Sequence, residues 1–445
     1  MKSRPSNGRL ALTYLPVNSL IIDPRNPRRH SSQQVSQIAR SIKAFGFAAP
    51  VLIDCNNKII AGTGRALAAN KLGLAEVPVI RLENLTETQA TALRVADNRL
   101  AERSTWDDKL LAATLKELST ADLNFDIEAV GFEMGEIDFR IQKFDGTNDD
   151  LEDGTEVLLP TSTRPVTRSG DLWLLGDHRL YCGNALDPSA YDALMNGKRA
   201  AASISDPPFN VKVHGHASRL GRVHHREFPM ASGEMNCGEY TGFLLTVFAL
   251  LAAHTVPGSL VYTFIDWRHL FEMVSAERQI FHELKNVCVW VKDRAGMGSF
   301  YRSQHELVLV FKNATAPHRN NMQLGKFGRD RSNVWNYPSA KTFSLQSEEG
   351  NLASLHPTVK SLRLVGDAIL DCSACGEVIL DCFIGSGTTL LAAKRVGRVC
   401  YGMDLDPLYC DVTIRRWQAD SGDHAVHAVS GESFDAIVKE KGGAS

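Results

Sequence analysis

The sequence predicts an α/β protein with two units: a small one at residues 10–100 and a larger one, built on a doubly wound sheet, at residues 169–420. In both, short apolar runs of strand length alternate with helical patterns. An acidic segment rich in Thr, Ser and Pro, residues 144–168, lacks sustained apolar periodicity and is typical of a linker. One strand of the larger unit leads into a Gly-rich turn and then a helix, as in α/β sheets that bind cofactors.

The composition is that of a folded globular protein. The 445 residues are 44% hydrophobic and 22% charged, which excludes wholesale disorder. The most apolar stretch, residues 243–253, is shorter than the ~20 residues that cross a bilayer, so we expect a buried helix there. The N-terminus lacks the apolar core of a secretory signal, and the nine scattered cysteines favour reduced thiols. We therefore expect a cytoplasmic location without membrane association, and the net charge of -2 leaves any DNA binding to local basic patches.

Four short strands and two helices are expected in the small unit. Ser31, followed by Gln34, is a helix N-cap signal, and Gly46 stands where a glycine commonly ends a helix. The strands are predicted at 20–22, 51–53, 59–61 and 77–80, and the helices at 32–45 and 65–72. A helical pattern at 86–118 follows, and residues 101–143 are assigned to a helical extension.

The larger unit carries apolar runs long enough for buried strands. They are predicted at 202–205, 260–264, 288–291, 307–311, 378–380 and 399–403. Residues 421–445 are polar apart from a short segment at 434–438, so a polar tail of open function is expected.

The strand at 378–381 runs into Phe-Ile-Gly-Ser-Gly, and a helix is predicted to begin at Thr388. Because Gly385 and Gly387 have no Cβ, a ligand can approach the backbone closely where this helix starts. The next strand ends about twenty residues further on, at Asp404, whose carboxylate can accept hydrogen bonds from ribose hydroxyls. These features predict a nucleoside pocket, whereas two glycines taken alone fit a turn of purely structural importance equally well.

The spacing of the glycines bears on the cofactor. A dinucleotide fingerprint would place a third glycine where this chain has Leu390. S-adenosylmethionine, which has a ribose but no phosphates, fits the pattern better than a nicotinamide or a flavin. A nicotinamide-dependent oxidoreductase is therefore a distant alternative.

The most specific motif is Asp206-Pro207-Pro208-Phe209, which follows an apolar strand. Each proline disfavours a helical conformation in the preceding residue and has no N–H, so the corner is stiff and rich in acceptors. Acceptors on Asp206 and on the Pro207 carbonyl can hold the two N–H groups of a nucleobase amine in line with a methyl donor. Phe209 offers a face on which an extruded base can stack. The alternative is an ordinary turn at the end of a strand with a packed phenylalanine.

These motifs resemble those of the amino-group DNA methyltransferases, which modify N6 of adenine or N4 of cytosine. The resemblance covers residues 170–418 and implies a Rossmann-like domain that binds S-adenosylmethionine. Because the catalytic motif precedes the cofactor motif, the order is that of the permuted, beta-type members. The resemblance assigns catalysis to Asp206, Pro207, Pro208 and Phe209, and cofactor binding to Asp381, Phe383, Gly385, Gly387, Thr388, Asp404, Thr358 and Lys360. Ser361 replaces a proline that is usual in this family.

A basic and aromatic segment lies between the two motifs, where the family places target recognition. We predict that it binds DNA through Arg319, Lys326, Arg329 and Arg331. A solvated surface loop is the alternative. A second basic segment, residues 213–227, follows the catalytic corner and is a candidate DNA-facing loop. No metal is expected, because the Cys372/Cys375 pair has no second pair to complete a zinc site.

The small unit resembles the ParB/sulfiredoxin domain, in Arg25-Asn26-Pro27-Arg28-Arg29 and in the segment Gly62-Thr63-Gly64-Arg65. Gly62, Gly64 and Arg65 form a candidate phosphate site at the start of a helix, for a nucleotide or for DNA phosphates. Sulfiredoxin chemistry is not expected, because the loop has no cysteine. No helix-turn-helix of the partition proteins is recognisable after this unit.

The resemblance implies an enzyme of the restriction-modification type that methylates N6 of adenine in double-stranded DNA, with a ParB-like accessory domain. An N4-cytosine methyltransferase is the first alternative. A ParB-like DNA-binding adaptor with an inactive methyltransferase domain is the second. The recognition sequence is left open, and so is the oligomeric state, with a homodimer as one candidate.

Overall fold

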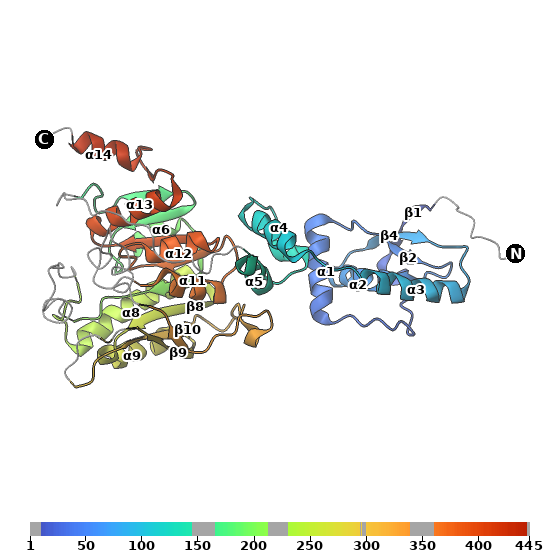
Figure 1. Ribbon diagram of the computed structural model, residues 1–445, viewed down its shortest axis with the longest axis horizontal. Coiled ribbons are helices and arrows are strands. Elements are labelled where there is room, and N and C mark those ends of the chain that lie inside the picture. Colours follow the sequence, from blue (N-terminus) through green and yellow to red (C-terminus); the bar gives the residue numbers. More distant parts are fainter. Residues whose placement is uncertain are drawn as a thin grey trace. The chain divides into compact units, whose positions relative to one another are not determined.

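The computed structural model describes residues 10–144, 165–211, 230–293, 295, 300–338 and 360–442 (Figure 1). The chain divides into two compact units, residues 1–144 and 145–445. The linker predicted at 144–168 lies almost entirely outside the described residues. Each unit is described by itself.

The first unit is a four-stranded sheet with strand order β1-β4-β2-β3. Val51, Val77 and Val79 are fully buried in its small core. Its strands are β1 (Leu12–Pro16), β2 (Val51–Ile53), β3 (Ile59–Ala61) and β4 (Glu76–Arg81). Its helices are α1 (Ser32–Phe45), α2 (Thr63–Lys71), α3 (Glu87–Ala101), α4 (Asp108–Thr120) and α5 (Met134–Phe144).

The predicted helix signals at α1 are confirmed. The Ser31 side chain accepts a hydrogen bond from the Gln34 N–H, and Gly46 ends the helix with a φ of 76°. Two other expectations are wrong. The strand predicted at 20–22 is only a single bridge between Ile21 and Lys58, because the first paired strand is the exposed β1. The helical pattern at 86–118 is two helices, α3 and α4, and Asp107 caps the second.

The second unit is built on a ten-stranded sheet with strand order β11-β9-β10-β8-β7-β12-β13-β6-β5-β14. The central strands β8, β7, β12, β13 and β6 are parallel. The doubly wound sheet is therefore a parallel core extended by antiparallel pairs on both sides. The strands are β5 (Leu172–Leu175), β6 (His178–Cys182), β7 (Ala200–Ser205), β8 (Thr255–Ile265), β9 (Glu283–Val291), β10 (His305–Lys312), β11 (Val334–Asn336), β12 (Val378–Asp381), β13 (Val399–Asp404) and β14 (Val426–His427).

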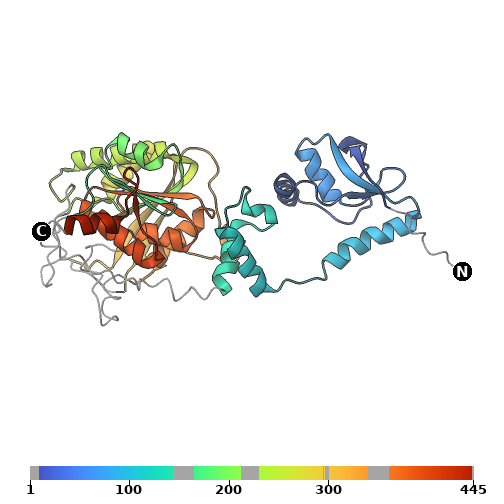
Figure 2. The ribbon, with the colours of Figure 1, turned by 90° about the horizontal axis from the view of Figure 1, so that it is seen from above.

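Helices cover both faces of this sheet. In Figure 2, the yellow-green α8 lies on one side of the sheet and the orange and red helices lie on the other. One layer is formed by α6 (Pro188–Met195), α8 (Cys237–His254) and α9 (Leu270–Ile280), and the other by α11 (Leu362–Cys372), α12 (Thr388–Arg395), α13 (Pro407–Ser421) and α14 (Phe434–Gly442).

The apolar helix α8 is the single described helix whose length and composition would allow a membrane span. As predicted, it packs in the core. Its residues Phe243, Leu244, Val247, Phe248 and Leu251 are buried.

The C-terminal segment, predicted as a polar tail with a short apolar part at 434–438, packs on the sheet through that apolar part. Its strand β14 pairs with β5, and the fully buried Phe434 of α14 contacts the Trp173 ring edge-on, with centroids 5.4 Å apart. Ile437 and Val438 of the same helix also pack against this core.

Candidate active site

The predicted site residues meet at the C-terminal ends of the parallel strands. Asp206 follows β7, Asp381 ends β12 and Asp404 ends β13. The loops that follow parallel strands all lie at the edge formed by the C-terminal ends of the strands, and α/β folds bind ligands at this edge. A pocket lies there. It is lined by Gly183, Ala185, Asp206, Pro208, Met230, Cys382, Phe383, Gly385, Asp404, Leu405 and Tyr409.

The corner at Asp206 is held by groups from other elements. Lys360 Nζ lies 2.7 Å from Asp206 Oδ2, and the Tyr240 hydroxyl donates to the Pro208 carbonyl at 2.9 Å. The Asn210 side chain accepts from the N–H groups of Gly233 and Met235, which ties the corner to the start of α8. Among the described residues, nothing donates a hydrogen bond to the buried Oδ1 of Asp206. A buried acceptor needs a hydrogen-bond donor, and an N–H group of a ligand could supply one here.

Lys360 belongs to a buried network of four charges. Its Nζ also lies 2.9 Å from Glu306 Oε2, and Lys292 pairs with the other oxygen of Glu306. Burial raises the pKa of Asp206, Glu306 adds to this rise, and Lys360 opposes it. Burial alone would raise the pKa of Glu306, but Lys360 and Lys292 outweigh it and hold this pKa at about 2.

The sequence assigns Lys360 to cofactor binding, which stays a prediction, and Lys360 lines a second, smaller cavity with Asp381 and Gly385. The structure directs the ammonium group at the Asp206 and Glu306 carboxylates, because a buried cation is stable only beside such partners. Thr358, the other residue assigned from the same segment, lies outside the described residues.

The glycine loop has the predicted strand–turn–helix form. The Gly385 N–H donates to Asp404 Oδ2 at 2.9 Å, which joins the loop to the acid at the end of the next strand. Gly387 adopts a φ of +84°, and a Cβ there would lie 2.8 Å from the Thr413 methyl carbon. Close helix packing and a left-handed backbone therefore require glycine at 387, while Gly385 and Phe383 line the pocket.

Both acids beside the loop have unusual pKa values. Burial raises the pKa of Asp404 and that of Asp381 from 3.8 to about 7. Asp404 accepts from the N–H groups of Gly385 and Asp406, and Asp381 accepts from the N–H of Phe383. Thr388 is buried at the first position of α12 and lines the second, smaller cavity beside Gly385.

Sequence reasoning missed the wall of the pocket that follows β6. Gly183 and Ala185 line it, and the Gly183 N–H donates to the Asp404 carbonyl at 2.9 Å. The sequence signal for this wall is the strand that ends in Cys-Gly-Asn near the start of the unit. Only the strand order shows that this strand lies beside β13. Glu306 was also missed as a site residue, because its partner Lys360 is remote in the sequence.

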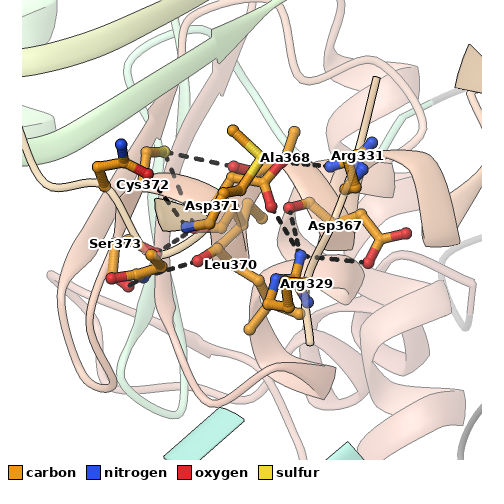
Figure 3. Close-up of polar contacts among 12 residues, drawn as sticks. Arg329, Arg331, Asp367, Ala368, Leu370, Asp371, Cys372 and Ser373 are labelled. Atoms are coloured by element: carbon orange, nitrogen blue, oxygen red, sulfur yellow. Dashed lines mark hydrogen bonds and ion pairs between the residues drawn. The ribbon is translucent and has the colours of Figure 1, made fainter. Parts of the chain in front are cut away.

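Two of the four predicted DNA-binding residues, Arg329 and Arg331, pair with carboxylates of the fold. Figure 3 shows Arg329 and Arg331 directed at the side chains of α11. Arg329 Nη2 lies 2.7 Å from Asp371 Oδ1, and Arg331 pairs with the other oxygen of Asp371. Arg329 is only 7% exposed. Carboxylates on α11 thus direct both guanidinium groups into the fold, and a DNA contact of these two residues stays an untested prediction.

The remaining predicted DNA contacts lie on the surface. Lys326 is exposed above the Phe327 ring, and Arg319 is half-buried with a guanidinium nitrogen 3.8 Å from Glu377. Their contact with DNA stays a prediction. The second basic segment, residues 213–227, lies outside the described residues. Within the described ranges, no group of three or more His, Cys, Asp or Glu side chains is placed to hold a metal ion.

In the first unit, the candidate phosphate site lies at the start of α2. Gly62 caps the helix with a φ of +97°, and a Cβ on Gly64 would lie 2.9 Å from the Ile38 side chain. Glycine at 64 thus permits the close packing of α1 on α2. The half-buried Arg65 donates to the Ala49 carbonyl at 3.0 Å, so its guanidinium is held beside the helix start.

The fold and the site define the class of the chain: a Rossmann-like methyltransferase domain with permuted motif order, preceded by a ParB-like domain. Comparison with known families identifies it further. The DNA methylase model matches residues 201–415, just under half of the chain, and the ParB N-terminal domain model matches residues 1–99. Both resemblances inferred from the sequence are confirmed. The family uses S-adenosylmethionine as its methyl donor.

A third model, the ParB-methyltransferase HTH domain, matches residues 109–169. The expectation that no helix-turn-helix follows the ParB-like unit is therefore wrong. The described part of this region holds α4 and α5, which an ion pair of 2.8 Å between Arg140 and Asp108 joins. The helical pattern that runs continuously from α3 into α4 hid the separate motif in the sequence.

Individual relatives cover different parts of the chain. The ParB-like nuclease domain-containing protein YnaK of Escherichia coli (strain K12) is 47% identical over 81 residues, which are 18% of this chain and 93% of YnaK. The type II methyltransferase M2.DpnII of Streptococcus pneumoniae is 31% identical over 173 residues, 37% of this chain and 62% of that protein. The type II methyltransferase M.ScaI of Streptomyces caespitosus is 30% identical over 100 residues, and this chain covers 32% of its length.

Among solved structures, the M1.HpyAVI complex with S-adenosylmethionine covers 53% of this chain and 97% of its own, with 21% identity and a TM-score of 0.39.

Proposed function

We propose that this chain transfers a methyl group from S-adenosylmethionine to N6 of adenine in double-stranded DNA. The observation that carries the proposal is the buried, unpaired Oδ1 of Asp206 at the edge of a pocket that also contains Gly385 and Asp404. The match to the DNA methylase model supports the reaction class. The choice of adenine is supported by Asp206 at the first position of the motif.

The pocket residues suit the cofactor. Asp404 accepts two backbone hydrogen bonds and keeps lone pairs for ribose hydroxyls, and Phe383 and Tyr409 supply apolar walls. When bound, S-adenosylmethionine supplies an electrophilic methyl group. The residues of this chain bind and orient the reactants, and no protein nucleophile is needed.

The catalytic work falls on the Asp206 corner. The nitrogen of a nucleobase amine is a weak nucleophile because its lone pair is delocalised into the ring. Asp206 Oδ1 and the Pro207 carbonyl can each accept one amine N–H, which holds the nitrogen in line for transfer and favours its pyramidal form. After transfer the nitrogen loses one proton, and Asp206 is the carboxylate placed to accept it. Lys360, 2.7 Å from the other oxygen of Asp206, favours the ionised form of this carboxyl.

Adenine is preferred to cytosine because Asp occupies the first position of the motif, as it tends to in the adenine-specific members of the family. N4-cytosine methylation is the alternative. The test is transfer of labelled methyl groups to unmethylated genomic DNA, followed by nucleoside analysis and modification-aware sequencing. We expect label in N6-methyladenine at a defined sequence. Label in N4-methylcytosine alone would contradict the base assignment, and no label despite cofactor and DNA binding would favour the adaptor alternative.

Cofactor affinity should rise with pH. Ribose hydroxyls donate to an ionised carboxylate, and the pKa of Asp404 is raised to about 7, so binding must displace a proton below that pH. In the unliganded protein, the raised pKa means that stability falls as pH rises from 3.8 towards 7, and the cofactor should offset this loss. Titration calorimetry from about pH 6 to about pH 8 should show affinity falling up to about tenfold per unit below the pKa.

The Asp404→Asn variant provides the control for this titration. It should bind the cofactor more weakly and lose most of the dependence on pH, whereas Asp381→Asn should retain the part due to Asp404. An affinity that is independent of pH in the unaltered protein would show that the ribose does not meet an ionised Asp404.

We further propose that the start of α2 binds the phosphates of a nucleotide. Gly62 frees the first N–H groups of the helix, and Arg65 adds a cation beside them. Arg65→Ala should weaken binding of nucleoside triphosphates about tenfold or more. Lys71→Ala, at the other end of α2, is the matched control and should bind normally. Equal affinity in both variants would remove the site.

A further inference from the structure

The exposed aromatic side chains of the second unit are unevenly distributed. Among its described residues, the large aromatic side chains that are strongly exposed are Trp267, Phe271, Phe300 and Tyr301, with exposed fractions of 55%, 88%, 86% and 81%. Leaving rings of this size exposed forgoes the favourable burial of their apolar surface. Such a cluster on one edge therefore indicates a surface that meets a partner.

The topology places all four rings at the edge of the sheet that carries Asp206. Strand β8 runs parallel to β7, and Trp267 and Phe271 follow its end. Strand β10 is antiparallel to both β8 and β9, so β9 runs in the same direction as β7. The segment between β9 and β10, which holds Phe300 and Tyr301, therefore emerges at the catalytic edge.

The base of the β9–β10 connection is joined directly to the catalytic network. The Lys292 N–H donates to the Gln304 carbonyl at 2.9 Å, and the Gln304 side chain donates back to the Lys292 carbonyl. Lys292 pairs with Glu306, which holds Lys360 on Asp206. Tyr301 lies three residues from Gln304, which limits their Cα separation to roughly 11 Å.

Phe300 and Tyr301 form a two-ring unit. Their ring centroids are 4.5 Å apart at an interplanar angle of 70°. The rings contact each other and are otherwise open to solvent. Trp267 differs, because the Arg268 guanidinium lies 4.9 Å from the centre of its ring. An uncovered aromatic pair is the type of group that inserts into a base stack.

We propose that Phe300 and Tyr301 enter the DNA duplex and fill the space left by the base that moves to the Asp206 corner. The proposal rests on the proposed function, since methylation of a base amine at a buried corner requires the base to leave the duplex. Unstacking a base step costs a few kcal/mol, and aromatic side chains that replace the lost stacking offset part of that cost. The partner is thus the stacked interior of double-stranded DNA next to the target base.

The test compares two short duplexes that contain the methylated sequence found in treated genomic DNA. In one the target base is paired, and in the other it lies opposite an abasic site, where extrusion is already easy. The double variant Phe300→Ala/Tyr301→Ala should lose about tenfold or more in kcat/KM on the paired duplex, equivalent to ~1.4 kcal/mol. On the abasic duplex it should stay within about twofold of the unaltered protein.

Matched variants distinguish insertion of the two rings into the duplex from a general contribution to DNA binding. Tyr301→Phe should keep most of the activity, and Val429→Ala, which removes an equally exposed apolar side chain after the edge strand β14, should show no change. Equal losses on both duplexes, or no loss on either, would overturn the proposal. The same selective loss in Phe271→Ala but not in the double variant would also overturn it. If the unaltered protein methylates neither duplex, the proposed function itself fails.

Discussion

Replacing Asp206 with Asn should reduce methyl transfer to DNA by at least about 10²–10³-fold, while the affinity for S-adenosylmethionine changes little. One positioned hydrogen-bonding group that acts in the transition state contributes about this much in other enzymes. An amide oxygen is a weaker acceptor than a carboxylate, and the amide cannot take up the proton that the methylated nitrogen releases. The measurement is single-turnover transfer of labelled methyl groups, with calorimetry for cofactor binding.

Two controls keep this prediction specific. Asp206→Asn also removes half of the charge that neutralises Lys360, so thermal unfolding must show that the variant remains folded at the assay temperature. Asp423→Asn, a change on the exposed loop after α13, should leave transfer unaltered. Transfer by Asp206→Asn within about tenfold of the unaltered rate would exclude the proposed role of the carboxylate.

Replacing Asp371 with Ala should destabilise the second unit by about 3–5 kcal/mol, the range observed when one partner of a buried ion pair is removed. Asp371 is 4% exposed and receives both Arg329 and Arg331 (Figure 3). Without its carboxylate, two largely buried guanidinium groups lose their main partner. Urea unfolding followed by tryptophan fluorescence reports on this unit, because it holds five of the six tryptophans.

The compensated variant makes this second prediction sharper. Asp371→Leu together with Arg329→Met and Arg331→Met removes all three charges, and it should recover a large part of the lost stability. Asp330→Asn, an exposed position in the same loop, should cost less than about 0.5 kcal/mol. If Asp371→Ala unfolds at the same urea concentration as the unaltered protein, the cluster does not stabilise the unit.

Helices and strands were predictable where the apolar periodicity and the capping or turn residues indicate the same element. The strands at 51–53 and 59–61 and the helix at 32–45 match the structure residue for residue, because apolar runs lie between caps and glycines there. The strand expected at 20–22 forms only one bridge, between Ile21 and Lys58. Apolarity by itself does not show whether a partner strand is present.

The sequence by itself determined the chemistry-bearing turns. Asp206 to Phe209, the glycine loop and Asp404 are each set by a strand and the few residues after it, so their local form follows from backbone preferences. Tertiary structure alone decided how distant side chains pair. It placed Lys360 on Asp206, withdrew Arg329 and Arg331 into the fold, and docked Phe434 beside Trp173. Burial and ion pairing depend on which elements become neighbours, and the order of strands in the sheet, absent from any local pattern, settles that.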